Sequence, residues 1–258
     1  MNVMQGSQVD PTGDLPRLER FRHELKRRQL TVVSTERLTP NMIRIALGGE
    51  DLADFTSLSA GDHVKIFVPD GVGGTAMRDY TPRHFDTANR TLVLDFAVHD
   101  AGPATRWALD ARVGDEIQIG GPRGSLVISG PIRSWLLIGD ETALPSIGRR
   151  IEEMAAGTPV TSLVGIPGVE DEQVFDTKAD VTSHWVHRKD PSDAAVFIER
   201  LRDIAIEPRT FVWVAAEGAV TRAIRSYLVE ERKHPLAWLR AAGYWVSGKA
   251  DTTEKFED

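Results

Sequence analysis

The segment most informative about the fold reads Met77-Arg78-Asp79-Tyr80-Thr81-Pro82-Arg83. It brings together a guanidinium, a flat ring and a hydroxyl, and in an extended chain residues 78 and 80 point to the same side. A flavin dinucleotide requires such groups: a cation for the pyrophosphate, a ring against the isoalloxazine and a small polar group at its edge. The alternative for an isolated pattern of this kind is an exposed strand end beside a proline.

The amino-acid composition excludes several classes of function and of reaction. The chain has 258 residues, 41% of them hydrophobic, which suits two medium-sized domains. A net charge of -7 and a pI near 5.6 provide no basic field for nucleic acid or anionic lipid. The absence of cysteine excludes disulfides, iron–sulfur ligation and thiol nucleophiles. Redox chemistry would therefore need a bound organic cofactor.

The two ends of the chain are polar. Residues 1–17 lack the apolar run of a signal peptide and are predicted to be a flexible leader, and residues 249–258 a polar tail. No stretch reaches the roughly 18 apolar residues of a membrane span. We expect a cytoplasmic protein, and a monomer.

The first half of the chain reads as short strands separated by glycine and proline turns, typical of an antiparallel barrel or sandwich over residues 18–130. The strands are expected at residues 30–34, 42–47, 63–68, 91–99, 116–119 and 125–128.

The second half, residues 131–248, alternates apolar strands with helices, which predicts a parallel sheet with crossover helices. The strands are expected at residues 135–139, 160–165 and 210–215, and the helices after Pro145, at 194–204 and at 219–231. A C-terminal helical segment closes the domain, and the domain boundary is placed near Gly130-Pro131.

Three turns offer candidate ligand contacts. Gly102-Pro103-Ala104-Thr105 enters a predicted helix whose free N–H groups suit a pyrophosphate, although an ordinary helix start has the same pattern. Asp140-Glu141-Thr142-Ala143 follows a parallel strand, the favoured place for a nucleotide, but its two acids would repel phosphate. Arg123 lies in a glycine-rich turn that alternatively only closes a hairpin.

Taken in order, these motifs resemble the FAD-dependent siderophore-interacting proteins, or ferric-siderophore reductases, a branch of the ferredoxin-reductase-like flavoproteins. The resemblance covers nearly the whole chain and rests on these segments: His63-Val64-Lys65, Arg78 to Arg83, Asp95 to Ala104, Gly121 to Ser125, Gly139 to Pro145 and Gly243-Tyr244-Trp245. It implies a six-stranded FAD-binding barrel followed by a NAD(P)H-binding α/β domain.

The resemblance also implies site residues in three groups. The FAD ligands would be Arg78, Tyr80, Thr81, Asp95, His99, Gly102, Ala104 and Thr105, with Asp140, Thr142, Ala143 and Trp245 from the second domain. The basic residues that receive an anionic ferric chelate would be His63, Lys65 and Arg123. Glu217, Arg222 and Arg225 would contact the nicotinamide nucleotide, although Glu217 would alternatively cap a helix and the arginines would line a solvated face.

The function implied is an NAD(P)H:ferric-siderophore oxidoreductase with FAD as cofactor, NADH or NADPH as donor and a ferric siderophore as substrate. Hard oxygen ligands hold Fe(II) far more weakly than Fe(III), so reduction releases the iron. Electron transfer through the flavin needs no catalytic side chain, and we expect no protein-bound metal. A reduced ferredoxin is another conceivable donor. The competing functions are a general NAD(P)H:flavin or quinone reductase and a non-catalytic flavin or siderophore carrier.

Overall fold

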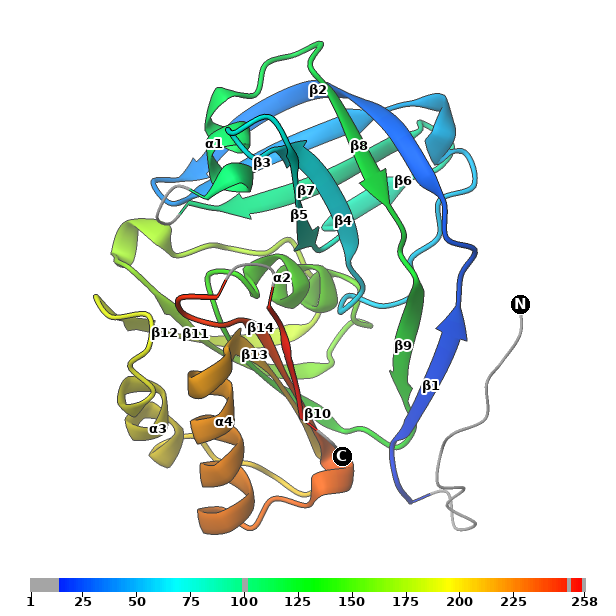
Figure 1. Cartoon of the computed structure of the whole chain (residues 1–258). Helices are drawn as coiled ribbons and strands as arrows, with labels where there is room; N and C mark the ends of the chain where they lie inside the picture. The colour runs from blue at the N-terminus through cyan, green and yellow to red at the C-terminus, as the bar shows by residue number, and fades with distance from the viewer. Residues whose placement is uncertain (1–13, 99–101, 250–251, 257–258) are drawn as a thin grey trace. The chain divides into compact units, whose positions relative to one another are not determined.

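The computed structural model describes residues 14–98, 102–249 and 252–256 (Figure 1). The described residues form two compact units: Leu18–Val127, and residues 14–17 together with those from Ile128 onward. The boundary expected from sequence, at Gly130-Pro131, lies just after this division.

The first unit is built on an antiparallel sheet of seven strands in the order β5-β4-β8-β2-β3-β7-β6. The strands are β2 (Arg27–Thr39), β3 (Met42–Gly48), β4 (Val64–Pro69), β5 (Thr75–Tyr80), β6 (His84–Asp86), β7 (Thr91–Ala97) and β8 (Glu116–Gly120). This confirms the antiparallel β domain. The sheet has one strand more than the six expected, and its end strands β5 and β6 share no ladder in the part of the chain that is described.

Alternating side chains build the core of this unit. In β3, Ile43, Ile45 and Leu47 are buried on one face, as the alternation in the sequence predicts. They pack in one cluster with alternate residues of β4 and β7 and with the helix α1 (Pro103–Asp110), which Figure 1 shows beside these strands. A 3-10 turn, Glu50–Leu52, adds the buried Leu52.

Two further strands, β1 (Arg17–Arg22) and β9 (Gly124–Ser129), form a separate two-stranded sheet and lie side by side in Figure 1. No strand was predicted for β1, because it is largely exposed and shows no apolar alternation. A Cβ at Gly124 would lie 2.3 Å from the carbonyl oxygen of Phe21, so only glycine lets the two strands approach this closely.

The second unit is built on a sheet in the order β12-β11-β10-β13-β14-β15, parallel except for β15. The strands are β10 (Ser134–Asp140), β11 (Pro159–Ile166), β12 (Asp180–His187), β13 (Thr210–Glu217), β14 (Leu239–Trp245) and β15 (Glu254–Lys255). The chain leaves β10 in one direction and returns to β13 on its other side. The carboxyl ends of β10 and β13 therefore form the switch point at which such sheets bind ligands.

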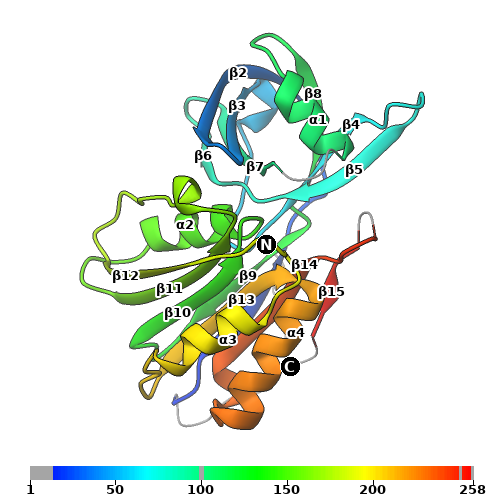
Figure 2. The same ribbon diagram turned by 90° about the vertical axis from the view of Figure 1, so that its left-hand side faces the viewer.

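Helices cover both faces of this sheet. Figure 2 shows α3 (Ala195–Arg202) and α4 (Gly218–Ser226) on one face, where they share an apolar cluster with alternate residues of β10 and β13. The other face carries α2 (Leu144–Glu152). Gly139 lies there, and a Cβ on it would come within 2.9 Å of the Ile147 side chain, so glycine lets α2 pack directly on the strand.

The C-terminal region differs from the expected helical segment. A 3-10 turn, Leu236–Trp238, leads into β14, a strand that extends the parallel sheet. Trp238 ends the 3-10 turn and is buried, while Tyr244 and Trp245 are the last two residues of the strand. Of the predicted polar tail, the described residues include β15, which pairs with β14. The remaining short elements are a 3-10 turn at Val169–Asp171 and a π-helical turn, Tyr227–Glu231, after α4.

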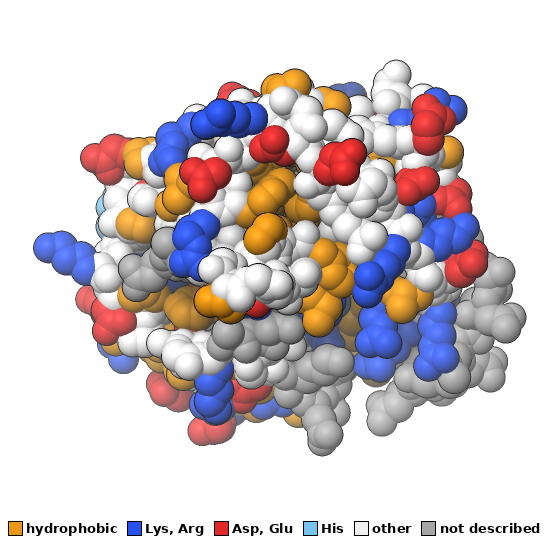
Figure 3. All heavy atoms as spheres, turned by 45° about the horizontal axis from the view of Figure 1, so that its top comes forward, with side chains coloured by type: hydrophobic (Ala, Val, Ile, Leu, Met, Phe, Trp, Pro, Cys, Tyr) orange, Lys and Arg blue, Asp and Glu red, His pale blue; other side chains and the backbone are white. Residues whose placement is uncertain are grey.

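The surface carries charges of both signs. On the face that Figure 3 shows, Lys and Arg side chains are interspersed with Asp and Glu, and apolar side chains lie between them. No described helix is long and apolar enough to cross a membrane.

Candidate functional site

In the first unit, β5 presents Arg78 and Tyr80 on one face, as the alternation predicts. Arg78 pairs with Ile66 and Tyr80 with Val64, and both partners are fully buried, so this is the face of the sheet that points to the core. The Arg78 guanidinium donates to the carbonyl oxygen of Met77 at 2.7 Å. Among the described residues it has no carboxylate partner, which leaves its charge available to an anion.

Tyr80 belongs to a chain of stacked rings. Its ring centroid lies 4.3 Å from that of Phe96 in β7, and Phe96 lies 5.6 Å from Trp107 in α1. Burial raises the pKa of the Tyr80 phenol, against a weaker opposing effect of Arg78, so the hydroxyl stays protonated and can donate. The stack ties β5 to α1 and so places two predicted FAD-binding segments close together.

The start of α1 is open. Gly102 is its N-cap residue, with extended backbone and no side-chain cap, and Pro103 opens the helix. No acidic residue lies in the first turn, and a Cβ on Gly102 would meet no atom within 4 Å. The N–H groups of Ala104 and Thr105 therefore point along the helix axis, and no acid among the described residues of this first turn lies against them, the arrangement that favours a phosphate group. Both side chains are buried. His99, predicted beside them, lies outside the described residues.

Asp95 has a structural role that the prediction of an FAD contact did not foresee. Its carboxylate accepts two hydrogen bonds of 2.7 Å from Arg44, which faces it across β3 and β7, and Arg83 lies 3.6 Å away. Both oxygens are engaged, and the residue is 4% exposed. This buried carboxylate holds β3 and β7 together through two arginines, a structural role beside the predicted contact with FAD. Thr81 is also buried.

The three predicted chelate-binding cations come from neighbouring segments of the first unit. His63 immediately precedes β4, and Arg123 follows β8; both are exposed and have no ion-pair partner among the described residues. Their backbones are close, since a Cβ on Gly121 would lie 3.7 Å from the carbonyl oxygen of His63. Lys65 lies on the face of β4 that points away from the core, where Asp79 is 3.1 Å from its ammonium group.

In the second unit, Asp140 at the end of β10 has no exposed surface, and its carboxylate is the centre of a hydrogen-bond network that we call the Asp140 hub. Oδ1 accepts hydrogen bonds from the backbone N–H of Thr142 at 3.0 Å and from its hydroxyl at 2.5 Å. Oδ2 accepts from the N–H of Glu217 at 2.9 Å and from the indole N–H of Trp245 at 3.0 Å, and Arg188 lies 3.6 Å away. The carboxylate thus joins three strand ends rather than contacting a cofactor.

This hub changes the roles predicted for its neighbours. The Thr142 hydroxyl and the Trp245 indole both donate their hydrogen to Asp140, so neither hydrogen is left to donate to FAD, although the hydroxyl oxygen can still accept. Ala143 donates its N–H to the Asp140 carbonyl oxygen at 2.9 Å, and its side chain is buried. A contact between this turn and FAD would have to come from backbone atoms, from the Thr142 hydroxyl oxygen or from the half-buried Trp245 ring.

Glu217 caps α4. Its Oε2 accepts hydrogen bonds from the N–H groups of Ala219 and Val220, at 2.5 and 3.0 Å, and its Oε1 accepts from the N–H of Ser247 at 3.1 Å. The side chain is buried. Of the two roles that the sequence left open, the structure therefore supports the helix cap and not the orientation of a nicotinamide.

The two arginines predicted to contact the nicotinamide nucleotide, Arg222 and Arg225, lie on α4. Arg222 is exposed and forms an ion pair with Glu254 in β15. Arg225 is half-buried, one residue before the last of the helix. The acidic partner of Arg222 makes this face of α4 less favourable for a phosphate than the sequence alone suggested.

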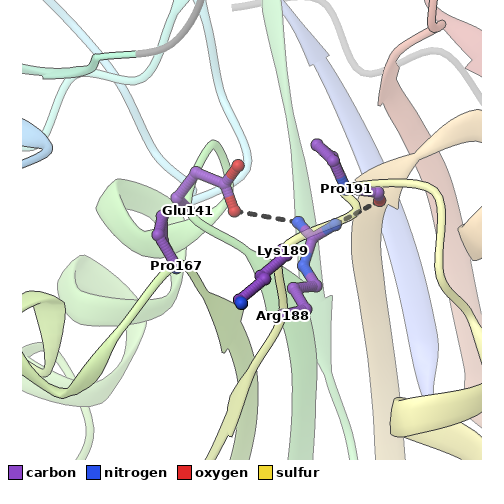
Figure 4. Close-up of a pocket in the computed structure, with 5 residues that line it drawn as sticks. All are labelled: Glu141, Pro167, Arg188, Lys189 and Pro191. Carbon is purple, nitrogen blue, oxygen red and sulfur yellow. Dashed lines mark hydrogen bonds and ion pairs between the residues drawn. The ribbon is translucent and has the colours of Figure 1, made fainter.

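A hollow of about 230 Å³ lies at the carboxyl ends of β10, β11 and β12. It is lined by Glu141, Pro167, Arg188, Lys189 and Pro191. Figure 4 shows Arg188 between its two partners: it donates to Glu141 Oε2 at 2.8 Å and to the carbonyl oxygen of Pro191. Lys189 is exposed and has no ion-pair partner in the described part of the chain. The sequence did not point to Arg188 and Lys189, because β12, the strand that they follow, was not identified from it.

Glu141 is the most perturbed acid of this hollow. Burial and the neighbouring charge of Asp140 raise its pKa from 4.5 to about 7, and the attraction of Arg188 offsets only part of this rise. The charge at the mouth of the hollow therefore changes near neutral pH. Among the described residues, no group of three His, Asp or Glu side chains is placed to hold a metal ion.

Comparison with known proteins agrees with these features. The family model described as siderophore-interacting protein matches residues 132–248, and the siderophore-interacting FAD-binding domain matches residues 31–76 and 71–126. The chain is 32% identical to the NADPH-dependent ferric-chelate reductase of Escherichia coli, over 88% of this chain and 96% of that protein. It is 27% identical to the ferric vibriobactin reductase ViuB of Vibrio cholerae, over 86% and 90% of the two chains.

A solved structure shows the same arrangement. The crystal structure of a siderophore utilization protein from T. fusca matches with a TM-score of 0.84 and 33% identity, over 92% of this chain and 98% of that one. Sequence and fold thus agree over both units, and the chain belongs to the siderophore-interacting protein family.

Proposed function

We propose that this protein is an FAD-dependent NAD(P)H:ferric-siderophore oxidoreductase, which reduces the Fe(III) of a bound siderophore and so releases Fe(II). The observation that carries this proposal is the similarity over both units to the E. coli NADPH-dependent ferric-chelate reductase. When bound, FAD would accept a hydride from the nicotinamide and pass single electrons to the iron.

The residues of the first unit fit FAD. Arg78 carries a guanidinium without a carboxylate partner among the described residues, and α1 opens with free N–H groups, so two anion-binding features lie in one unit. Tyr80 offers a ring held by Phe96. We propose that Arg78 and the start of α1 bind the pyrophosphate and that Tyr80 orients the flavin ring.

The ferric siderophore is the substrate, and His63, Lys65 and Arg123 are proposed to attract it. Anionic chelates require cations that are not already neutralised, and the exposed Arg123 meets this condition within the described structure, with the exposed His63 imidazole as a neighbouring hydrogen-bonding group. Lys65 is partly neutralised by Asp79. The chelate would compete with this carboxylate for the ammonium group.

For the electron donor we propose the hollow beside Arg188 as part of the nucleotide site. It lies at the carboxyl ends of parallel strands, where such sheets bind nucleotides. Glu141 provides an acceptor for ribose hydroxyls, and Lys189 an unpaired cation for a phosphate. A phosphate contact of this kind is common to NADH and NADPH, and the NADPH dependence in the name of the E. coli relative favours NADPH as the donor. We propose this hollow in place of the site predicted on α4.

An absorbance experiment tests the proposal. The purified protein, loaded with FAD, is mixed anaerobically with NADH or NADPH, and a ferric siderophore is added last. We expect the absorbance of oxidised flavin to bleach when the nucleotide is added and to return when the ferric chelate is added, at a rate on the order of 10 per second. A protein that binds FAD but is bleached by neither nucleotide would be a carrier or use another donor, such as reduced ferredoxin. Equal activity with quinones and ferric chelates would indicate a general reductase.

A cytoplasmic location and a monomeric state also remain predictions. Light scattering of the FAD-loaded protein measures the second directly. A mass near twice the 28.5 kDa of the chain would show that the monomer is wrong.

A further inference from the structure

A buried polar network is formed by residues next to the three proposed chelate-binding residues in the sequence. Its centre is Asp62, which is 3% exposed. Asp62 Oδ2 accepts hydrogen bonds from the hydroxyl of Ser57 at 2.8 Å, from the N–H of Ser59 at 3.1 Å and from the hydroxyl of Ser125 at 2.5 Å. A carboxylate this deeply buried is retained only with such partners.

Ser125 is the link between distant segments. Since its hydroxyl donates to Asp62, its oxygen accepts the N–H of Leu58 at 3.0 Å and has one lone pair left for His23 Nε2 at 2.8 Å. The network therefore assigns the hydrogen of His23 to Nε2. This is not the order of a hydrolytic triad, because the serine lies between the acid and the histidine and has no free lone pair with which to attack.

The network joins the two segments that carry the cations. Asp62 immediately precedes His63 and is three residues before Lys65, while Ser125 is two residues after Arg123. The backbone around Arg123 is held as well, since its carbonyl oxygen accepts the N–H of His23 at 3.0 Å. The backbone that carries the exposed Arg123 side chain is thus held at two points: at Arg123 itself, by His23, and at Ser125, by Asp62.

We infer that Asp62 and Ser125 are positioning residues, which set the spacing between the His63–Lys65 segment and Arg123 and so determine how tightly an anionic ferric chelate binds. Both are too deeply buried to touch the chelate themselves. Side chains that are held at a fixed spacing lose less conformational entropy on binding than side chains on mobile loops. The hydrogen bond between Ser125 and Asp62 is therefore expected to affect the affinity for the chelate and not the rate of electron transfer. The inference rests on the proposed function, because it takes the ferric chelate as the ligand.

The test compares Ser125→Ala with the unchanged protein, both loaded with FAD. The probes are the ferric and the redox-inert gallium(III) complexes of one tris-catecholate chelator. We expect the dissociation constant of the gallium complex, and the KM of the ferric complex, to rise roughly tenfold, because the chelate must then order about one side chain that the intact network already holds in place. The KM for NADPH and the FAD content should not change. Ser125→Thr, which keeps the hydroxyl, should restore most of the affinity.

Two further variants control the result. Ser134→Ala removes a part-buried hydroxyl that bonds to Thr210 in the second unit, and it should leave gallium-complex binding unchanged. Asp62→Asn keeps the side-chain shape but removes the charge and one acceptor, so it serves if Ser125→Ala fails to fold; we expect the same selective loss.

Several outcomes would overturn the inference. Unchanged affinity for the gallium complex in folded Ser125→Ala and Asp62→Asn would do so, and so would a parallel rise in the KM for NADPH or a loss of FAD, because these indicate general loosening. If the unchanged protein binds the gallium complex but does not reduce the ferric one, the proposed reductase activity is wrong while the positioning role is still measured by binding. If it binds neither complex, both are wrong.

Discussion

The Asp140 hub makes the sharpest prediction, through the substitution Asp140→Asn. The carboxylate accepts four hydrogen bonds, two at each oxygen, from Thr142, Glu217 and Trp245. An asparagine side chain offers one oxygen only, and its amide group meets two donors wherever it points. The Thr142 hydroxyl can turn to accept, so the least harmful orientation still leaves one backbone N–H without an acceptor.

These contacts give the expected loss in the free energy of unfolding. A hydrogen bond to a charged group contributes about 1.5–3 kcal/mol, and Arg188 also loses one of its two nearby carboxylates. We expect Asp140→Asn to lower the free energy of unfolding of the second unit by about 3–5 kcal/mol, a large part of the total stability of a domain.

Urea denaturation followed by far-UV circular dichroism measures this loss. Hydrogen exchange adds a local measurement, because the backbone amides of Thr142 and Glu217 depend on Asp140 and should exchange faster. Asp180→Asn, at the exposed start of β12, is the matched control and should change stability by less than about 0.5 kcal/mol. A loss below about 1 kcal/mol, or unchanged exchange at both amides, would refute the role of the hub.

Three further predictions concern single residues. Asp79→Ala removes the carboxylate beside Lys65 and should tighten binding of the gallium(III) tris-catecholate complex about two- to fivefold, as measured by titration; weaker binding would contradict the proposed cation site. Because the pKa of Glu141 is raised from 4.5 to about 7, the folded chain keeps a proton that the unfolded chain has lost, so its contribution to stability falls as pH rises between these values. The free energy of unfolding should therefore fall by about 2–4 kcal/mol less between pH 4.5 and 7 in Glu141→Gln than in the unchanged protein. Identical pH profiles of stability for the two proteins would contradict the raised pKa. Gly124→Ala places a Cβ 2.3 Å from the Phe21 carbonyl oxygen and should lower the free energy of unfolding by about 1–3 kcal/mol, seen as a lower Tm. In the control Gly61→Ala the new Cβ would meet only the Ser59 side chain, at 4.0 Å, and the Tm should stay within about 2 °C. Equal Tm values for the two variants would show that β1 and β9 can separate without cost.

Much of the fold follows from local patterns. The alternation in β3, the continuous apolar run of β10 and the glycine turns predict the two kinds of sheet, because side-chain periodicity depends only on neighbours along the chain. β1, β12 and β14 were not identified as strands. β1 and β12 are largely exposed and lack a clear apolar pattern, and β14, with the sequence LRAAGYW, has neither an apolar alternation nor the β-branched residues typical of strands.

The predicted site divides in the same way. The sequence by itself determined that Arg78 and Tyr80 share one face of a strand, that α1 opens at Gly102 with free N–H groups, and which family the motifs resemble. These properties depend on residues a few positions apart, and local spacing is sufficient to derive them.

Only the tertiary structure decided which polar residues are already used by the fold. Asp140 meets Glu217 and Trp245, which are 77 and 105 positions away, and Asp62 meets Ser125 across 63 positions. No local pattern reveals such partners, since they come together only when the strands take their order in the sheets. An acid that looks available for a cofactor becomes a structural hub once buried donors surround it, because a buried charge must be satisfied within the fold.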